Sequence, residues 1–386
     1  MDVSTWDQPP AGAPKQPFSG SYQLDDCQFL LKPLHLEPIA LREKERLIQS
    51  GERHYSEMLS EEAPPTATYL ELFRALTLTY AERLGQDIVS LAAHIGATRT
   101  APVTIVSLAR AGTPVGALLQ RALIRQGSAQ PRHYSVSIIR DRGIDNNALR
   151  HILRVDARPP AGLVFVDGWT AKGVITRELR AAITRWNHAN PEQLDPRLYV
   201  LSDIGGSADV AATEEDYAIP SGILNATVSG LVSRSLLNAQ IGPHEFHGCV
   251  YYQAFEPLDQ SRWFLDQVSR TFARAHARPL RSQPREQRAR ATRDWLRRCM
   301  AQHAITDLNL VKPGIAEATR VLLRRIPDRL IVRDPGAADL QHLMALAESR
   351  AVAVEIDPTL PFQAAALIRS CRDRPASASA ASREEP

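Results

Sequence analysis

The chain has 386 residues, of which 44% are hydrophobic and 23% are charged, and its formal net charge is +3. This length is too great for a single small core and predicts two or three domains. The small net charge excludes a globally basic nucleic-acid binder, so any nucleic-acid surface must be local. No apolar run approaches the roughly 20 residues of a membrane span, and no basic segment followed by an apolar core stands at the start. We therefore expect a cytoplasmic protein that makes no membrane contact.

The first quarter of the chain predicts a lead followed by helices. Residues 1–18 are rich in Pro, Gly, Ala and Gln, a composition that predicts a disordered lead. Apolar residues at helical spacing then predict a helix within 38–59, which Gly51 interrupts, and a longer helix over 69–95.

A first strand–turn–helix pattern follows these helices. Residues 103–108 predict a buried strand, and a turn and a helix that starts near 117 come next. A second strand is predicted over 134–139, and the polar segment after it begins with Arg140. Strands alternating with helices are typical of an α/β protein with a parallel sheet.

A second strand–turn–helix pattern is centred on Asp167. The four apolar residues 163–166 predict a strand buried on both faces of a parallel sheet, and Asp167 stands where this strand is predicted to end. A short Gly-containing loop leads to a helix that starts near 174. Ligands of open α/β sheets bind outside the carboxyl ends of strands, where helix N-termini attract phosphate. The pattern predicts a phosphate site, with an ordinary βα turn as the alternative.

A further strand is predicted over 198–203, with Asp203 at its end and a Gly-rich loop over 205–209 beyond it. Polar groups at strand ends again indicate the ligand edge of a sheet. We therefore include Asp203 among the candidate substrate-binding residues.

The turns of both patterns resemble the ligand loops of type I phosphoribosyltransferases. In that family an Arg-Ala-Gly turn faces the diphosphate of phosphoribosyl diphosphate, and an acidic pair after four hydrophobic residues precedes a Thr/Gly loop that grips the 5-phosphate. The matching residues of the first turn are Arg110, Ala111, Gly112 and Thr113, and those of the second are Asp167, Gly168, Thr170, Ala171, Lys172 and Gly173. Gly168 stands in place of the second acid, and Lys172 stands where the family usually has a small or hydroxyl residue.

The resemblance implies a phosphoribosyltransferase-like (Rossmann-like) parallel sheet with flanking helices. It implies two catalytic residues, Asp167 on the ribose hydroxyls and Arg110 on the diphosphate. It also places Arg140 in a mobile hood over the reacting centre, with a solvated loop of scattered charges as the alternative. It also implies Mg²⁺ held mainly by oxygens of the substrate, so that no dedicated metal cage is expected. The ribosyl phosphate would pass to a base-like acceptor.

Other stretches resemble one bacterial family found with stress and tellurite-resistance genes, whose members are labelled phosphoribosyltransferase-like or cysteine protease StiP. These stretches include GSY near the start, SGERHYSEML, and the segment 219–235, in which small and hydroxyl residues alternate with apolar ones. The resemblance covers 19–270, which we take as one domain.

The protease label directs attention to the cysteines. The four cysteines are far apart and form no CxxC pair, which argues against a zinc knuckle or a disulfide framework. Cys249 is the candidate nucleophile, with His244 or His247 as its base. In the alternative, Cys249 is a small apolar residue at the start of a strand and His247 is a structural residue.

The rest of the chain predicts a linker and a small second domain. Residues 271–306 are rich in Arg and predict a basic helical linker. Residues 307–371 predict a small α/β (α-β-α) domain with a last helix over 361–371, and they resemble the Pelota-type RNA-binding domain. The residues that match its Gly turn and helix start are Gly314, Glu317 and Arg320. The Ser/Ala-rich tail, 372–386, is expected to be disordered.

These features define two main functional hypotheses and a more distant third. In the first, the chain transfers ribosyl phosphate and binds RNA through its C-terminal domain, in a bacterial stress or tellurite-resistance context. In the second, which Gly168 favours, it senses phosphoribosyl diphosphate or a related nucleotide without turnover and binds RNA. The third is a cysteine peptidase that uses Cys249. Each hypothesis is compatible with a homo-oligomer.

Overall fold

The computed structural model describes residues 18–280 and 285–369. The chain divides into two compact units, Met1–Arg290 and Ala291–Pro386. The predicted disordered tail, 372–386, and all but the last residue of the predicted lead lie outside the described residues. Among the helices in the described part of the chain, none is both long and apolar enough to cross a membrane.

The first unit is built on a seven-stranded sheet, in which six strands run parallel to their neighbours. In spatial order these six are β1 (Gln28–Leu30), β4 (Arg132–Ile139), β3 (Thr104–Ala109), β6 (Leu163–Thr170), β7 (Leu198–Asp203) and β8 (Val210–Thr213). The seventh, β5 (Gly143–Ile144), pairs antiparallel with β4. A separate two-stranded sheet consists of β2 (Lys32–Pro33) and β9 (Gly248–Cys249).

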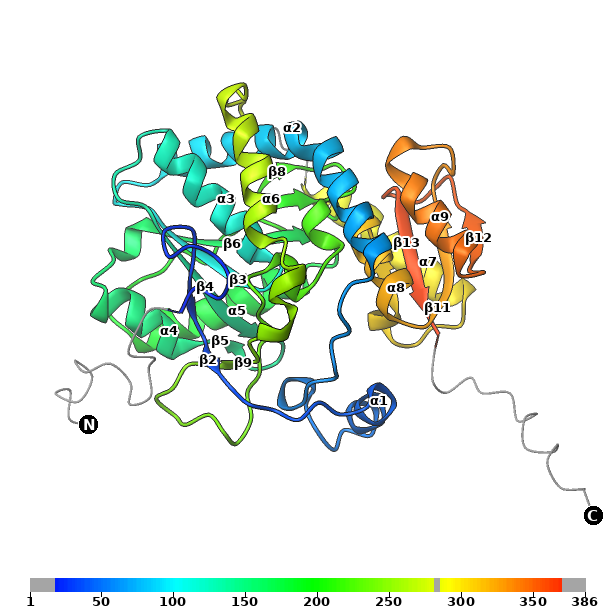
Figure 1. Cartoon of the computed structure of the whole chain (residues 1–386), viewed down its shortest axis with the longest axis horizontal. Helices are drawn as coiled ribbons and strands as arrows, with labels where there is room; N and C mark the ends of the chain where they lie inside the picture. The colour runs from blue at the N-terminus through cyan, green and yellow to red at the C-terminus, as the bar shows by residue number, and fades with distance from the viewer. Residues whose placement is uncertain (1–17, 281–284, 370–386) are drawn as a thin grey trace, which may run out of the picture. The chain divides into compact units, whose positions relative to one another are not determined.

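Helices cover both faces of the main sheet. One face carries α2 (Ala67–Thr98), α3 (Gly112–Arg125) and α6 (Ser261–Ser269), and the other carries α4 (Asn146–Arg150) and α5 (Val174–Ala189) (Figure 1). A further helix, α1 (Leu41–Gln49), precedes them in the chain. The connections β3–α3–β4 and β6–α5–β7 proceed in opposite directions along the sheet, so two right-handed crossovers place α3 and α5 on opposite faces. The predicted parallel sheet with flanking helices is confirmed.

The strands predicted from apolar runs are confirmed, with one difference in length. Residues Val164, Phe165 and Val166 are 0% exposed, as expected for a strand between two helical layers. The strand β6 does not end before Asp167 but continues to Thr170, because its pairing with β7 extends to Thr170 opposite Asp203. Asp167 therefore belongs to the last part of a strand rather than to a loop.

The helix after β3 begins earlier than predicted. It was expected near 117, but α3 starts at Gly112, directly after the turn. Pro114 lies in its first turn, where a residue without an N–H group is tolerated because the first N–H groups of a helix have no partner within the helix. The turn after β3 is therefore shorter than the sequence pattern indicated.

The second unit is a small α/β unit with a four-stranded sheet, as predicted in outline. Its strands, in spatial order, are β10 (Val311–Pro313), β13 (Ala364–Ile368), β11 (Pro327–Val332) and β12 (Ala353–Ile356). Its helices include α7 (Arg285–Gln302) from Ala291 onward, α8 (Ile315–Arg324) and α9 (Gln341–Ser349).

The prediction of a helix over 361–371 is wrong, because this segment contains the strand β13. The strand is hydrogen-bonded to β10 on one side and to β11 on the other. Its residues Ala364 to Leu367 are at most 1% exposed. A run of alanines favours a helix locally, but pairing along both edges of a buried central strand outweighs this weak preference.

The predicted basic linker, 271–306, is not a linker along its whole length. The compact second unit begins at Ala291, and Trp295 of α7 is buried within it. The indole of Trp295 meets Phe362 edge to face at 5.6 Å between ring centroids, and its Nε1–H donates to Asp357 at 2.8 Å. The many arginines nearby in the sequence obscure the pattern of an apolar helical face, which includes Leu296 and Cys299, both also buried.

Candidate functional site

Two turns leave the main sheet side by side at its carboxyl edge. The strands β3 and β6 are neighbours, with Ser107 opposite Val166. β4 lies beyond β3 and β7 lies beyond β6, so the strand order reverses between β3 and β6. Open α/β sheets bind ligands at such a topological switch point. The turn that contains Arg110 and the turn that follows Asp167 are therefore adjacent, although 57 positions separate these residues in the sequence.

The turn after β3 packs closely against the carboxyl end of strand β6. A Cβ atom on Gly112 would lie 2.6 Å from the carbonyl oxygen of Val166, and one on Gly168 would lie 3.0 Å from the carbonyl oxygen of Ala111. A larger residue at either position would push this turn away from the end of β6, so the close approach explains both glycines. It also gives a steric reason for Gly168 at the position where type I phosphoribosyltransferases carry a second acid.

Asp167 is held at the end of β6 with its carboxylate turned back on the chain. The side chain is largely buried, with 8% of the residue exposed, and its Oδ1 accepts the N–H of Gly168 at 2.8 Å. A Cβ atom on Gly112 would lie 3.4 Å from the same Oδ1, so α3 begins next to this carboxylate. The structure thus places Asp167 and Gly112 together.

The segment Thr170 to Gly173 forms a tight turn into α5. Gly173 adopts a φ of 67° and precedes the first helical residue, Val174. The Thr170 hydroxyl lies 3.0 Å from the Ser207 hydroxyl, and a Cβ on Gly205 would lie 1.9 Å from the carbonyl oxygen of Ala171. The loop after β7 therefore packs against this turn. The N-terminus of α5 directly follows the turn, as a phosphate-binding turn requires.

The backbone of Lys172 and the side chain of Thr113 have structural roles beside these turns. The carbonyl oxygen of Lys172 accepts a hydrogen bond from Arg177 of α5 at 3.1 Å. Thr113, the last residue matched in the first turn, is buried, and its hydroxyl lies 2.7 Å from that of Ser135 on β4. Thr113 therefore fixes α3 on the sheet.

Arg110 is already engaged with a carboxylate. Its Nη1 donates to Glu62 Oε2 at 2.8 Å and to the carbonyl oxygen of Val232 at 3.2 Å. The other carboxylate oxygen of Glu62 accepts the N–H of Ala226 at 2.8 Å. Sequence reasoning missed Glu62 because its partner is 48 positions away and no local pattern marks it.

Arg140 contacts the same N-terminal segment that carries Glu62. Its N–H donates to the Tyr55 hydroxyl at 2.8 Å, and its guanidinium lies 5.9 Å from the centre of the Tyr55 ring. Arg234 lies 5.4 Å from the same ring and donates to the Tyr55 carbonyl oxygen at 2.7 Å. Tyr55 and Arg234 were not predicted as site residues.

Asp203 supports the loop beyond β7. Its carboxylate accepts the N–H groups of Ser207 at 2.9 Å and Ala208 at 3.0 Å, and it lies 3.6 Å from Arg288. Burial raises the pKa of Asp203 above its usual value, although these hydrogen bonds act in the opposite direction. The structure therefore connects Asp203 with the turn at Thr170 through Ser207.

The cysteine candidate is enclosed and is not paired with a histidine. Cys249 is 0% exposed, and burial raises the pKa of its thiol to about 12. His247 instead places its Nδ1 2.7 Å from the Ser137 hydroxyl, and its backbone N–H donates to Asp145 at 2.6 Å. Burial lowers the pKa of His247, whereas His244 is exposed.

In the second unit, the residues matched to the Pelota Gly turn lie together at the start of α8. Gly314 has a φ of 92°, a conformation that favours glycine, and its N–H donates to the Ala364 carbonyl oxygen at 2.7 Å. Glu317 and Arg320 form an ion pair at 3.2 Å along the helix. Gly314 thus caps the N-terminus of α8, Glu317 lies in its first turn and Arg320 in its second.

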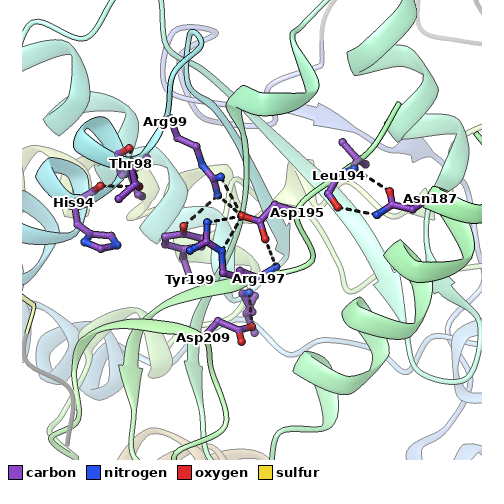
Figure 2. A network of polar contacts seen from close by, with 11 residues as sticks. His94, Thr98, Arg99, Asn187, Leu194, Asp195, Arg197, Tyr199 and Asp209 are labelled. Atoms are coloured by element: carbon purple, nitrogen blue, oxygen red, sulfur yellow. Dashed lines mark hydrogen bonds and ion pairs between the residues drawn. The ribbon is translucent and has the colours of Figure 1, made fainter. Parts of the chain in front are cut away.

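A network of polar contacts between arginine, aspartate and tyrosine side chains lies at the amino end of β7 (Figure 2). Arg99 donates to Asp195 through both terminal nitrogens at 3.0 Å and to the Tyr199 hydroxyl at 3.1 Å, and Arg197 donates to the same carboxylate. This network connects the end of α2 to the segment before β7, which is a structural role.

Within the described ranges, no group of three or more His, Cys, Asp or Glu side chains is arranged to hold a metal ion. Among the predicted site residues, Asp167 is the one whose carboxylate lies beside the turn after β3.

The fold and the site define a class: an α/β protein with two adjacent, glycine-containing turns at the switch point of a parallel sheet, followed by a small α/β unit. The chain belongs to the StiP family, since the family described as "Tellurite-like stress resistance cysteine protease StiP" matches residues 20–269. It is similar to the "Cysteine protease StiP" of Acinetobacter baylyi, with 39% identity over 369 residues, which cover 92% of this chain and 95% of that protein. The "PELOTA RNA binding domain" matches residues 290–370.

Two solved structures are more distantly similar. A hypoxanthine phosphoribosyltransferase of Trypanosoma cruzi is 16% identical, with coverage of 34% of this chain and 77% of that chain and a TM-score of 0.27. An alanine mutant described under "Analysis of an invariant aspartic acid in HPRTs" is 17% identical, with the same coverage and a TM-score of 0.26. These scores are too low to define a shared fold.

Proposed function

We propose that this chain binds phosphoribosyl diphosphate or a related nucleotide at the carboxyl edge of its main sheet and transfers the ribosyl phosphate to a base-like acceptor. The observation that carries this proposal is the close packing of the turn after β3, at Ala111 and Gly112, against the carboxyl end of β6 at Gly168, on the two neighbouring strands of the switch point. A sugar phosphate with an anionic group at each end needs two such turns next to each other.

Each matched residue has a role in this proposal. Asp167 binds the ribose hydroxyls, the turn from Thr170 to Gly173 and the N-terminus of α5 bind the 5-phosphate, and Arg110 binds the diphosphate. The transition state resembles a ribosyl cation, so catalysis consists mainly of positioning and charge stabilisation. Oxygens of the substrate would hold Mg²⁺, which would supply charge neutralisation on the leaving group.

The geometry of Gly168 removes the sequence argument for the sensing alternative. The close approach of Ala111 explains why this position lacks the second acid, so the missing carboxylate does not by itself indicate a loss of activity. A cysteine peptidase, the activity named for the Acinetobacter relative, ranks below both because Cys249 is enclosed and paired with no histidine.

We propose further that the second unit binds RNA. The match to the Pelota RNA-binding domain supports this role, as does the position of Gly314 at the N-terminus of α8 with Arg320 in the second turn of that helix. Backbone groups at a helix start, joined by an Arg side chain, recognise RNA mainly by its shape and phosphates. The family description supports a place for both activities in a bacterial tellurite-type stress response.

The transfer is tested by measuring pyrophosphate release from phosphoribosyl diphosphate with a mixture of bases. Asp167→Asn should abolish release, and Asp25→Asn, at an exposed position away from the turns, should leave it unchanged. Saturable binding without release by the wild type would support sensing instead. Thiol-dependent proteolysis that Cys249→Ala removes would support the peptidase.

A further inference from the structure

The carboxylate of Glu62 occupies a set of donors suited to an anion. Arg110 Nη1 donates to one oxygen at 2.8 Å, and the Ala226 N–H donates to the other at 2.8 Å. The side chains of Arg110 and Glu62 are only 16% and 15% exposed. A guanidinium and a backbone N–H that converge on two oxygens form the donor pair that oxyanions take at many binding sites.

Glu62 belongs to a segment that satisfies several arginines around the carboxyl edge. Tyr55 of this segment contacts Arg140 and Arg234 through its ring, its hydroxyl and its carbonyl oxygen. Glu57 of the same segment forms an ion pair with Arg142. The segment from Tyr55 to Glu62 therefore contributes two carboxylates and one aromatic ring to a cluster of guanidinium groups.

We propose that Glu62 is an internal ligand of the diphosphate subsite, and that the diphosphate of the substrate displaces it from Arg110 and from the Ala226 N–H. This inference rests on the proposed function, because it takes the ligand to be the diphosphate of that site. It assigns two elements that no sequence motif indicates: Glu62 as the competing anion and Ala226 as a donor to the ligand.

The competition has a direct physical basis. A carboxylate carries one negative charge, whereas a diphosphate carries more charge and more acceptor oxygens. The diphosphate therefore displaces the carboxylate from the same donors once its concentration is sufficient. Displacement of Glu62 is a step that binding must include, and it weakens the apparent affinity in proportion to how fully Glu62 occupies the subsite. Removal of its charge should therefore tighten anion binding.

Calorimetric titration of the full chain with inorganic pyrophosphate tests this inference. Glu62→Gln keeps the size of the side chain and its ability to accept a hydrogen bond but removes the charge, and it should tighten pyrophosphate binding about tenfold, or about 1.4 kcal/mol. Glu61→Gln is the matched control, since Glu61 is adjacent and exposed, and it should bind like the wild type. Arg110→Gln should weaken binding both alone and combined with Glu62→Gln.

The outcomes separate this inference from the proposed transfer. Equal affinities in the wild type and Glu62→Gln, or equal tightening in Glu61→Gln, would overturn the role of Glu62. Tighter binding in Glu62→Gln without pyrophosphate release from phosphoribosyl diphosphate would support the subsite and refute the transfer. No pyrophosphate binding by any variant would overturn both. Glu62→Ala and a thermal melt of each variant guard against a misfolded Glu62→Gln.

Discussion

The turn between Thr170 and Gly173 depends on Gly205, and the substitution Gly205→Ala tests that dependence. A Cβ atom at this position would lie 1.9 Å from the Ala171 carbonyl oxygen, 2.6 Å from its carbonyl carbon and 2.8 Å from its Cα. All three atoms belong to backbone, so no side-chain rotation relieves the overlap. To reach an ordinary contact distance of 3.4 Å, the turn at Ala171 must move away by about 1.5 Å.

This displacement defines the size of the effect. Overpacking of this kind usually costs about 1–3 kcal/mol, which corresponds to a fall in melting temperature of roughly 5 °C for a unit of this size. A misplacement of about 1 Å in a positioning element reduces function by roughly 100-fold. We therefore expect Gly205→Ala to melt slightly earlier and to lose about two orders of magnitude in affinity for ribose 5-phosphate.

Calorimetric titration with ribose 5-phosphate and a thermal melt measure the two effects separately. Gly96→Ala in α2 is the control, because the nearest atom to its Cβ is Leu123 Cδ2 at 4.0 Å, and alanine is the better helix former. It should raise the melting temperature slightly and leave binding unchanged. Wild-type affinity in a stable Gly205→Ala protein would show that this turn does not hold the phosphate.

Three further predictions concern the rest of the molecule. Asp195→Asn should lower the free energy of unfolding by about 1–3 kcal/mol at pH 7, because Arg99 loses a half-buried carboxylate. Burial alone raises the pKa of Asp195, but hydrogen bonds from Arg197 and Arg99 lower it overall. The extra stability of the wild type should therefore be complete above about pH 4 and be lost as the pH falls through the lowered pKa. A difference in unfolding free energy between wild type and Asp195→Asn that stays constant with pH would contradict this. Cys249 should resist thiol reagents at pH 8 in the native protein and react after unfolding, whereas rapid native labelling would favour the peptidase. Arg320→Gln should weaken binding of a structured RNA and reduce the slope of log affinity against log salt by about one, and an unchanged slope would remove Arg320 from the interface.

The sequence was sufficient for features that depend on neighbours along the chain. The apolar run at 163–166 predicted a strand buried on both faces, and the position of Asp167 predicted a polar group near its carboxyl end, because period and turn residues are local signals. The local signal could not extend the strand to Thr170, since that pairing is with β7. It also could not make a strand of Ala364–Ile368, where the partners on both sides decide the conformation.

The order of the strands and the contacts across the carboxyl edge lay beyond local patterns. That β3 and β6 are neighbours follows from the sheet as a whole, and the resemblance to a known family supplied that expectation where periodicity could not. The ion pair between Glu62 and Arg110 joins segments 48 positions apart through a single contact. The sequence did not indicate a role for Glu62, because a glutamate in a polar segment is usually a solvent-exposed surface residue.

Two of the partly buried ion pairs of the first unit, Arg99–Asp195 and Arg110–Glu62, differ in a way that bears on function. At the amino edge, Asp195 is bound by Arg99 and Arg197, residues at the ends of the elements that the network joins (Figure 2). At the carboxyl edge, Glu62 comes from a segment outside the main sheet and covers the turn at Arg110. A buried ion pair stabilises a fold little more than apolar side chains of the same volume would, because both charges lose their hydration. Stability alone therefore gives little reason for a carboxylate at this turn. If Arg110 and the Ala226 N–H must release one anion in order to bind another, they need a charged partner that can be exchanged, and Glu62 is such a partner.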